Sequence, residues 1–284
     1  MKVRHGRDKT RSRKILRGVL TYALYVVMTL IWTFPVIWVI LTSLKPRTQI
    51  FTVPPTIIFE PTLTHYITAL TDQDIMPSII NSLMIACGTT LLTLSLSVPA
   101  GYAFARVTFR LRSQLSFFAL LTQMAPPIGL IIPYFFLLSN IHMLDSYTGL
   151  IAIHMTLTVP FSIWLMITYF QGLPMCLEEA ATVDGASPFS TFFKIALPNV
   201  LGGVGVTAIF AFIESWNEFL YAVVLTGSKT KTAPVAIFSF LGAEESRYGP
   251  FTATGVMIMA PVIIVALLAQ RHIIKGMTLG ATKG

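Results

Sequence analysis

Of the 284 residues, 54% are hydrophobic and 11% are charged, and that charged share is about half the value of an ordinary soluble domain. Such a chain cannot cover itself with a water-compatible surface, which excludes a soluble globular protein. The formal net charge of +8 would suit nucleic-acid binding if the basic residues were clustered, but they lie in gaps between long apolar runs. The two cysteines, Cys87 and Cys176, are far apart and lack the spacing of metal ligands.

Uncharged apolar stretches divide the chain into six predicted transmembrane helices. Each stretch reaches or exceeds the roughly 20 helical residues that cross a bilayer core. The apolar runs are continuous rather than alternating, which favours helices over a barrel. The expected fold class is an all-α membrane protein with a transmembrane domain over 18–275. The predicted spans are 18–43, 78–105, 114–138, 147–171, 199–227 and 250–271, between a basic segment at 1–17 and a tail at 276–284.

The basic residues also predict an orientation, because they favour the cytoplasmic side of a membrane. If the N-terminus lies inside, basic residues on the inner side outnumber those on the outer side about three to one. We therefore expect both termini to be cytoplasmic.

The third predicted span contains a proline-rich break near 122–133, with Pro126, Pro127 and Pro133. Proline removes an intrahelical hydrogen bond and kinks the axis. In transporters a broken helix often lines the substrate path. A kink that serves packing alone is the alternative.

The connection over 172–198 predicts two short helices that meet at a glycine. The first covers 177–184, with acidic residues at its N-terminal end that complement the helix dipole, and Gly185 caps it. Ser187 then caps a second helix that opens with Pro188, the position where proline costs least. Both helices are expected to project from the cytoplasmic face.

The side chains expected on the surface of this connection are acidic and aromatic. Helices that lie on a membrane surface usually carry Lys and Arg to meet anionic lipid, whereas this segment has three carboxylates and one lysine. A loop held on the membrane by its phenylalanines is the alternative, but the charges favour a protein partner. The residues concerned are Glu178, Glu179, Asp184, Lys194, Phe189, Phe192 and Phe193.

The same connection resembles the signature loop of importer-type ABC permeases. The pattern is Glu-Ala-Ala, three residues, Gly, nine residues, Ile, one residue and Leu-Pro, and it occurs here without a gap. In that family the loop is the coupling helix that docks in a cleft of the ATP-hydrolysing subunit. The resemblance implies the same role here, with Glu179 as the partner of a basic group on the ATPase. The matching residues are Glu179, Ala180, Ala181, Gly185, Ile195, Leu197 and Pro198.

Three further segments narrow the resemblance to maltose-type sugar permeases, and among them to the shorter of the two paired subunits. These segments are Asn81-Ser82-Leu83, Trp216-Asn217-Glu218-Phe219 and the tail from Lys275 to Gly284. The resemblance implies the importer-type ABC permease fold, a place in a bacterial cytoplasmic (inner) membrane, and transport of a sugar or sugar-like solute.

The resemblance also implies a set of partners. They are a second homologous permease subunit in a heterodimer, two copies of a cytoplasmic ABC ATPase, an external solute-binding protein and membrane lipid, with no nucleic acid among them. The sequence contains no Gly-x-x-x-x-Gly-Lys-Ser/Thr phosphate loop. We therefore expect a transport subunit and not an enzyme, with ATP and Mg bound by the partner ATPase and no cofactor bound by this chain.

Glu214 and Glu218 are four residues apart in the fifth predicted span, which would place them on one helical face. Counting roughly 1.5 Å per residue puts both in the outer half of the membrane. Intramembrane carboxylates usually face a bundle interior or a wet cavity. We expect the pair to line the translocation path and accept hydrogen bonds from sugar hydroxyls, or else to hold helices together. The path candidates are Glu214, Trp216, Asn217, Glu218 and Tyr221.

Two other classes of protein explain less of the sequence. An ion-coupled secondary transporter would use Glu214 and Glu218 to bind protons or sodium, but it gives no role to the acidic connection. An intramembrane enzyme lacks a recognisable nucleophile or metal set. His154, the only histidine well inside a predicted span, is expected to be buried and hydrogen-bonded.

The connection over 228–249 is expected to lie outside the membrane and to contact the substrate-loaded binding protein. A solvated turn is the alternative. The contact candidates are Glu244, Glu245, Arg247 and Tyr248.

Overall fold

The structure is a computed structural model that describes the backbone of residues 4–72, 74–242 and 247–281, and the side chains of residues 17–72, 74–242 and 247–268. Within these residues the chain is mostly helical, as the sequence predicts. The helices long and apolar enough to cross a membrane alone are α1 (Arg4–Leu44), α3 (Ile75–Arg106), α6 (Tyr147–Gly172) and α13 (Tyr248–Ala281). Two bent pairs bring the number of spans in the described chain to six, if each pair counts as one.

The bent pairs and the short elements complete the described chain. The first pair is α4 (Arg112–Thr122) with α5 (Pro127–Asn140), and the second joins the helical segment 188–199 to α10 (Leu201–Asn217). The segment 188–199 consists of α8 (Pro188–Thr191), a π-helical turn at Phe192–Ala196 and α9 (Leu197–Asn199). The other short helices are α2 (Thr64–Thr71), α7 (Cys176–Val183), α11 (Ala222–Leu225) and α12 (Ala233–Ala236), with 3-10 turns at Arg47–Gln49 and Ile237–Phe240.

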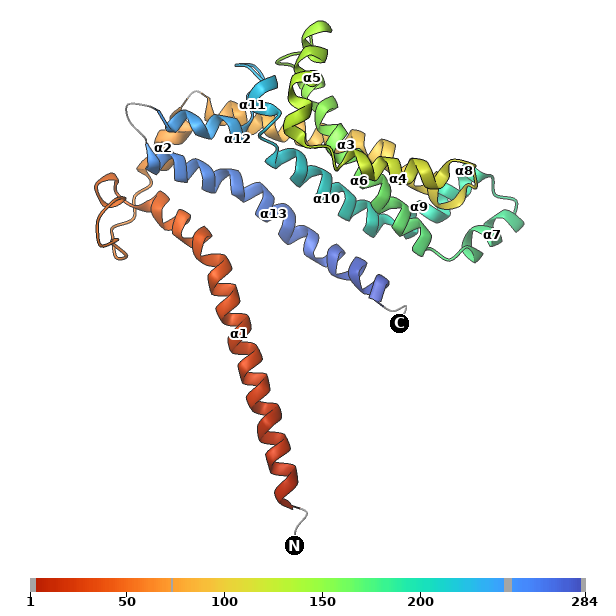
Figure 1. The fold of residues 1–284 in the computed structure, drawn as a ribbon, viewed down its shortest axis with the longest axis horizontal. Helices are drawn as coiled ribbons and strands as arrows, with labels where there is room; N and C mark the ends of the chain where they lie inside the picture. The colour runs from red at the N-terminus through yellow and green to blue at the C-terminus, as the bar shows by residue number, and fades with distance from the viewer. Residues whose placement is uncertain (1–3, 73, 243–246, 282–284) are drawn as a thin grey trace.

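Helices α3 and α6 lie side by side at the centre of the bundle, and α10 packs against both (Figure 1). Gly101 of α3 lies so close to Met166 of α6 that a β-carbon on the glycine would overlap it. Farther along, the hydroxyls of Thr93 and Thr158, both fully buried, are 2.7 Å apart. Small residues and buried hydroxyls are how membrane helices approach closely without a hydrophobic driving force between them. The α3–α6 pair is therefore the central packed unit of the chain.

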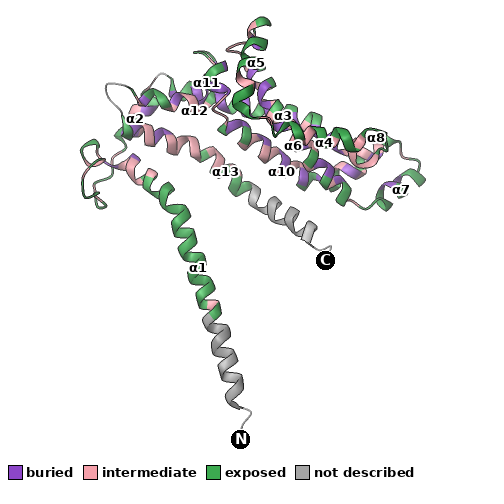
Figure 2. Cartoon of the chain, viewed as in Figure 1, coloured by how far each residue is buried: buried purple, intermediate pink, exposed green. Residues whose placement is uncertain are grey.

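Helix α1 stands apart from the bundle over most of its length. Figure 1 shows it diverging toward the N-terminus, while its C-terminal end contacts α13 and α2. Its most apolar stretch has no buried residue, and Figure 2 shows that part of α1 exposed on all sides. Trp32, for example, is 78% exposed. An apolar helix that is exposed all round requires lipid or another chain around it.

The third span is broken where its prolines predict. The axes of α4 and α5 differ by 94° across residues 123–126. Pro126 and Pro127 have no N–H to donate, so the helix cannot continue through them. The side chain of Gln123 instead donates to the carbonyl of Leu157 on α6, at 2.5 Å. The break is thus fixed to the central pair and is not a loose loop.

The fifth span differs from the prediction of one helix over 199–227. Helix α10 ends at Asn217, because Glu218 takes an extended backbone conformation with φ −65° and ψ 124°. The chain then forms the short α11, so the apolar residues up to Leu225 do not extend α10. At its other end, α10 makes an angle of 75° with the segment 188–199.

Candidate functional site

The first half of the connection between α6 and α10 forms α7, closed by the glycine that the sequence singled out. Gly185 has φ +81°, a left-handed conformation that glycine adopts without steric cost. Its N–H donates to Thr182 O at 3.0 Å, and the N–H of Ala186 donates to Ala181 O at 2.9 Å. This pair of bonds is the Schellman arrangement, which satisfies the last carbonyls of a helix. The predicted corner is therefore confirmed.

The second half starts as predicted and presents apolar rings to the outside. The hydroxyl of Ser187 accepts from the N–H of Ser190 at 3.3 Å and caps α8, which opens with Pro188. Phe189 is 75% exposed and Phe193 is 54% exposed, and their ring centroids are 5.7 Å apart.

An exposed surface of mixed character results where α7 meets α8. The exposed residues that α7 contributes include Glu179, Ala180 and Val183, and the last of these is 88% exposed. We call Glu179, Ala180, Val183, Phe189 and Phe193 the α7–α8 surface. It combines a carboxylate with apolar side chains, which is the composition of a protein contact and not of a basic membrane-surface helix.

Of two further side chains expected on this surface, Phe192 is half-buried and Glu178 is buried. The ring of Phe192 packs against Tyr102 and Phe170, with centroid distances of 4.9 Å and 6.3 Å. Glu178 is only 8% exposed. The prediction of three exposed carboxylates is therefore wrong for Glu178, because that carboxylate has partners within the chain.

Glu178 ties α7 to the end of α3. Arg106 Nε donates to Glu178 Oε1 at 2.7 Å, and the hydroxyl of Tyr102 donates to Glu178 Oε2 at 2.9 Å. Arg106 Nη2 also donates to the carbonyl of Leu173, at 2.8 Å. Both side chains of the ion pair are 10% exposed. We call Arg106, Glu178 and Tyr102 the α3–α7 clamp, and it fixes both the start of the connection and its first helix.

The residues of the signature pattern divide between this surface and the core. Ala181 is buried, and Ile195 and Leu197 are partly buried. Leu197 packs against the hydrophobic cluster formed by Val98, Met166, Phe170, Ala196 and Val200. The exposed members are Glu179, Ala180, Gly185 and Pro198. The buried and partly buried residues of the pattern therefore hold the two short helices in place, and its exposed residues lie on their outer side.

Glu214 and Glu218 do not share a helical face, contrary to the prediction, because α10 ends between them at Asn217. Glu214 is exposed on the last turn of α10. Glu218 turns back and caps the next segment, with Oε1 accepting from Tyr221 N at 2.7 Å and Oε2 from Ala222 N at 3.0 Å. The two carboxylates therefore have different surroundings and different roles.

A buried histidine joins Glu218 to α6 and α10. His154 Nδ1 lies 2.7 Å from Ser215 Oγ, and Nε2 lies 3.4 Å from Glu218 Oε2. His154 is fully buried, which confirms the prediction of a buried, hydrogen-bonded histidine. The cluster connects the α6 helix to the break after α10.

The aromatic path candidates are covered by this chain itself. Trp216 and Tyr221 are each 1% exposed. Trp216 Nε1 donates to the carbonyl of Ile258 at 3.1 Å and so attaches α10 to α13. Glu214 and Asn217 are the path candidates whose side chains are exposed here.

At the opposite end of the bundle, Asp145 holds the connection between α11 and α12. Its Oδ1 accepts from Thr230 N at 2.9 Å and from Thr230 Oγ1 at 2.7 Å, and its Oδ2 accepts from Lys229 N at 3.2 Å. Burial alone would raise the pKa of Asp145, but hydrogen bonds from Thr230, Gly227 and Lys229 outweigh it and lower the pKa. Sequence reasoning missed Asp145, since nothing local relates it to a segment 84 residues later.

The Asn81-Ser82 pair at the start of α3 secures the same connection. Asn81 Nδ2 donates to the carbonyls of Lys229 and Lys231, at 3.1 Å and 3.0 Å. Ser82 Oγ accepts from Ala233 N at 2.8 Å. These contacts give a structural reason for two residues that the sequence marked only by resemblance.

The predicted contact residues for a binding protein lie close to this end. Arg247 and Tyr248 are exposed, and the Arg247 guanidinium lies over the ring of Phe240 at 5.1 Å. Glu244 and Glu245 lie outside the described residues. Among the residues that the structure describes, no group of three or more His, Cys, Asp or Glu could hold a metal ion.

Comparison with known proteins agrees with this geometry. The family model described as a binding-protein-dependent transport system inner membrane component matches residues 97–279. The trehalose/maltose transport system permease protein MalG of Thermococcus litoralis is 34% identical over 275 residues, which cover 95% of this chain and 99% of that protein. The arabinooligosaccharides transport system permease protein AraQ of Bacillus subtilis is 30% identical over 265 residues, or 92% and 94% of the two chains.

The fold itself has a solved counterpart. A chain from a bacterial ABC transporter involved in the import of the acidic polysaccharide alginate has a TM-score of 0.77 to this one. The match covers 92% of this chain and 97% of that chain at 23% sequence identity. It therefore supports the arrangement of helices described above.

Proposed function

The chain belongs to the family of binding-protein-dependent transport system inner membrane components, and from this we propose that it is the permease subunit of an ATP-driven ABC importer for a sugar or sugar-like solute. Relatives of at least 30% identity over more than nine-tenths of the chain carry sugar-transport names. The sugar class rests on those names together with the Trp216–Phe219 segment and the C-terminal tail of the sequence. The chain forms half of the translocation path.

The α7–α8 surface is the observation that carries the coupling role. Glu179, Phe189 and Phe193 are exposed on two short helices, of which α7 is closed by Gly185 and α8 is capped by Ser187, and the clamp beneath them is anchored to α3. A cleft on a cytoplasmic ATPase would cover the two rings and pair a basic group with Glu179. ATP and Mg are bound by that ATPase, since this chain has no phosphate loop in its sequence.

Further partners follow from the rest of the surface. The exposed apolar α1 supports a second, homologous permease subunit beside this chain in a heterodimer. Two ATPase copies then dock on the two permeases, one of them on the α7–α8 surface of this chain. The connection over 228–249, with Arg247 and Tyr248 exposed, meets the solute-binding protein on the outer side. In this proposal the α7–α8 surface and both termini lie in the cytoplasm, and the chain lies in a bacterial inner membrane.

The hydrogen bonds that Glu218 accepts disfavour an ion-coupled carrier. Both carboxylate oxygens already accept backbone hydrogen bonds, from Tyr221 and Ala222. Binding a proton there would convert an acceptor into a donor and weaken the cap of α11. Glu214 remains exposed and belongs to the translocation path or to the contact with the second permease.

The test measures solute uptake by the reconstituted complex, first after ATP depletion and then after collapse of the ion gradients. Uptake should stop when ATP is depleted and continue when ion gradients are collapsed, and the reverse result would refute the proposal. Glu179→Lys should leave membrane insertion intact but weaken copurification of the ATPase. Glu60→Lys, which changes an exposed carboxylate between α1 and α2, is the matched control and should copurify the ATPase normally.

A further inference from the structure

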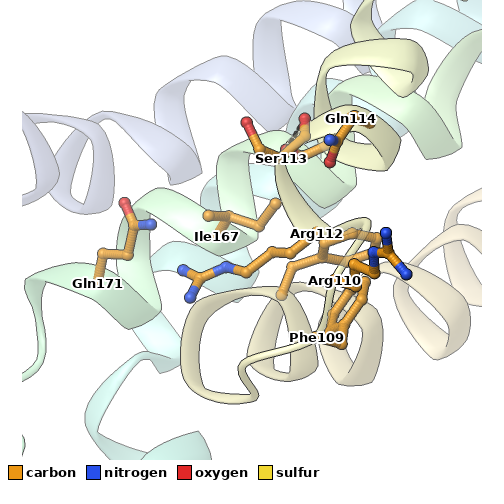
Figure 3. Close-up of a pocket in the computed structure, with 9 residues that line it drawn as sticks. Phe109, Arg110, Arg112, Ser113, Gln114, Ile167 and Gln171 are labelled. Atoms are coloured by element: carbon orange, nitrogen blue, oxygen red, sulfur yellow. Dashed lines mark hydrogen bonds between the residues drawn. The ribbon is translucent and has the colours of Figure 1, made fainter.

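A cavity of about 470 Å³ lies beside the connection between α3 and α4 (Figure 3). This connection is at the same end of the bundle as α7 (Figure 1). The start of α4 and the last turns of α6 complete its wall. Among the residues that the structure describes, none with a carboxylate lines it. The polar side chains around it are Arg110, Arg112, Ser113, Gln114, Ser116 and Gln171. Every one of them can donate a hydrogen bond, so the lining suits an anion.

The two guanidinium groups are available for such a ligand. Arg112 uses one N–H, donated by Nη2 to the carbonyl of Ala105 at 3.3 Å, out of the five that a guanidinium carries. Within the described part of the chain, neither Arg110 nor Arg112 has a carboxylate within ion-pairing distance. Figure 3 shows the guanidinium of Arg112 extending toward Gln171, while that of Arg110 lies on the other side beside Phe109.

The surroundings of the cavity are those of a membrane interface. Helix α3 ends at Arg106 and α6 ends at Gly172, so the cavity lies where the apolar spans give way to polar residues. Along α4 and at its N-cap Leu111, directly beside the arginines, apolar side chains remain exposed. They are Leu111 at 55%, Leu115 at 45%, Phe117 at 62% and Phe118 at 63%. Basic groups at the end of a span next to a strip of exposed apolar residues match a phospholipid, with its charged headgroup and its acyl chains.

We propose that this cavity binds the phosphate of an anionic phospholipid, held by Arg112 and Arg110, with the acyl chains along the exposed face of α4. A guanidinium presents paired N–H groups that fit phosphate oxygens in a bidentate manner. A free phosphate ion would satisfy the arginines but would leave the apolar strip uncovered. This site is independent of the sugar carried and of the coupling role of α7.

The binding experiment uses the purified chain, with the subunits that copurify, in nanodiscs of phosphatidylcholine that contain labelled phosphatidylglycerol. Retention of the labelled lipid is measured for the parent and for the variants. Arg110→Gln and Arg112→Gln should each weaken retention roughly fivefold, from the typical contribution of one basic residue near anionic lipid. Arg112→Lys should retain part of the binding, because it keeps the charge and loses the paired donors.

Lys194→Gln is the matched control, since Lys194 is also exposed and basic but does not line the cavity, and it should bind the lipid like the parent. If labelled phosphatidylcholine were retained as well as labelled phosphatidylglycerol, the proposal would be overturned, because the site would then not discriminate anionic from zwitterionic headgroups. Complete displacement by inorganic phosphate would overturn it in favour of a simple anion site. Unchanged lipid retention in both arginine variants, with loss of ATPase copurification, would assign the cavity to the ATPase instead.

Discussion

Replacement of Arg106 by glutamine should release α7 from α3, and the size of the effect follows from the contacts that are lost. Arg106 makes two hydrogen bonds, to Glu178 Oε1 and to the carbonyl of Leu173. A hydrogen bond to a charged group contributes about 1.5–3 kcal/mol, and removing one partner of a buried ion pair costs about 3–5 kcal/mol. Because both side chains of the pair are 10% exposed, water can replace part of the loss. We therefore take the lower end, about 3 kcal/mol.

Hydrogen exchange of the α7 amides measures this quantity directly. A loss of about 3 kcal/mol corresponds to roughly a hundredfold faster exchange through local opening. Tyr102→Phe removes one hydrogen bond to Glu178 and keeps the ion pair, so it should accelerate exchange less than Arg106→Gln. Substrate-stimulated ATP hydrolysis by the assembled complex should fall in the same order, while amides of the α3–α6 centre, around Thr93, keep their protection.

The double replacement Arg106→Glu with Glu178→Arg separates a specific clamp from a general loss of stability. Restored charge pairing should recover part of the α7 protection that either single variant loses. Exchange of α7 that stays at the parent rate in Arg106→Gln would refute the reasoning, because the two hydrogen bonds would then contribute nothing to holding α7.

Three other substitutions test further features. Gly185→Ala forces a side chain into a left-handed conformation at a cost of about 1–2 kcal/mol, so α7 protection against exchange should fall about tenfold. Glu218→Gln removes one of two backbone-accepting oxygens and should lower the thermal stability of the purified chain, whereas Glu214→Gln should leave stability unchanged and alter uptake; equal stability in both would contradict their different surroundings. The pKa of Asp145 is lowered from 3.8, so its carboxylate contributes fully to the stability of the 226–233 connection above that pH, and this contribution is lost as the pH falls through the lower pKa of the folded state. Proteolysis of the connection should therefore increase in acid, and Asp145→Asn should abolish this pH dependence.

Features encoded by neighbouring residues could be predicted from the sequence. The cap at Ser187, the left-handed Gly185 and the break at Pro126 each depend on a few adjacent residues, and each is present in the structure. Four long spans followed from apolar length alone, and the described chain reaches the predicted six if each bent pair counts as one span. In a membrane these local rules are strict, because an unsatisfied backbone group in hydrocarbon costs several kcal/mol.

Features that depend on distant residues were missed or wrong. The apolar run that follows Asn217 has no helix-breaking residue, so α10 was predicted to continue to 227. Its end depends on Glu218 capping α11 beside His154, which is 64 residues earlier in the chain. The partner of Glu178 is 72 residues away. Neither relation leaves a pattern in the local sequence. From the sequence, Arg106 was therefore interpreted only as a basic residue on the cytoplasmic side.

The clamp and the close contact of Gly101 with Met166 have a mechanical consequence for the whole chain. They connect α3, α6 and α7, since Gly101 of α3 lies directly against Met166 of α6 and Arg106 at the end of α3 pairs with Glu178 of α7. A displacement applied at α7 is therefore expected to move α3 and α6 together with it. The break after α4 and the turn after α10 should follow, because Gln123 is hydrogen-bonded to Leu157 of α6 and Glu218 lies beside His154 of the same helix.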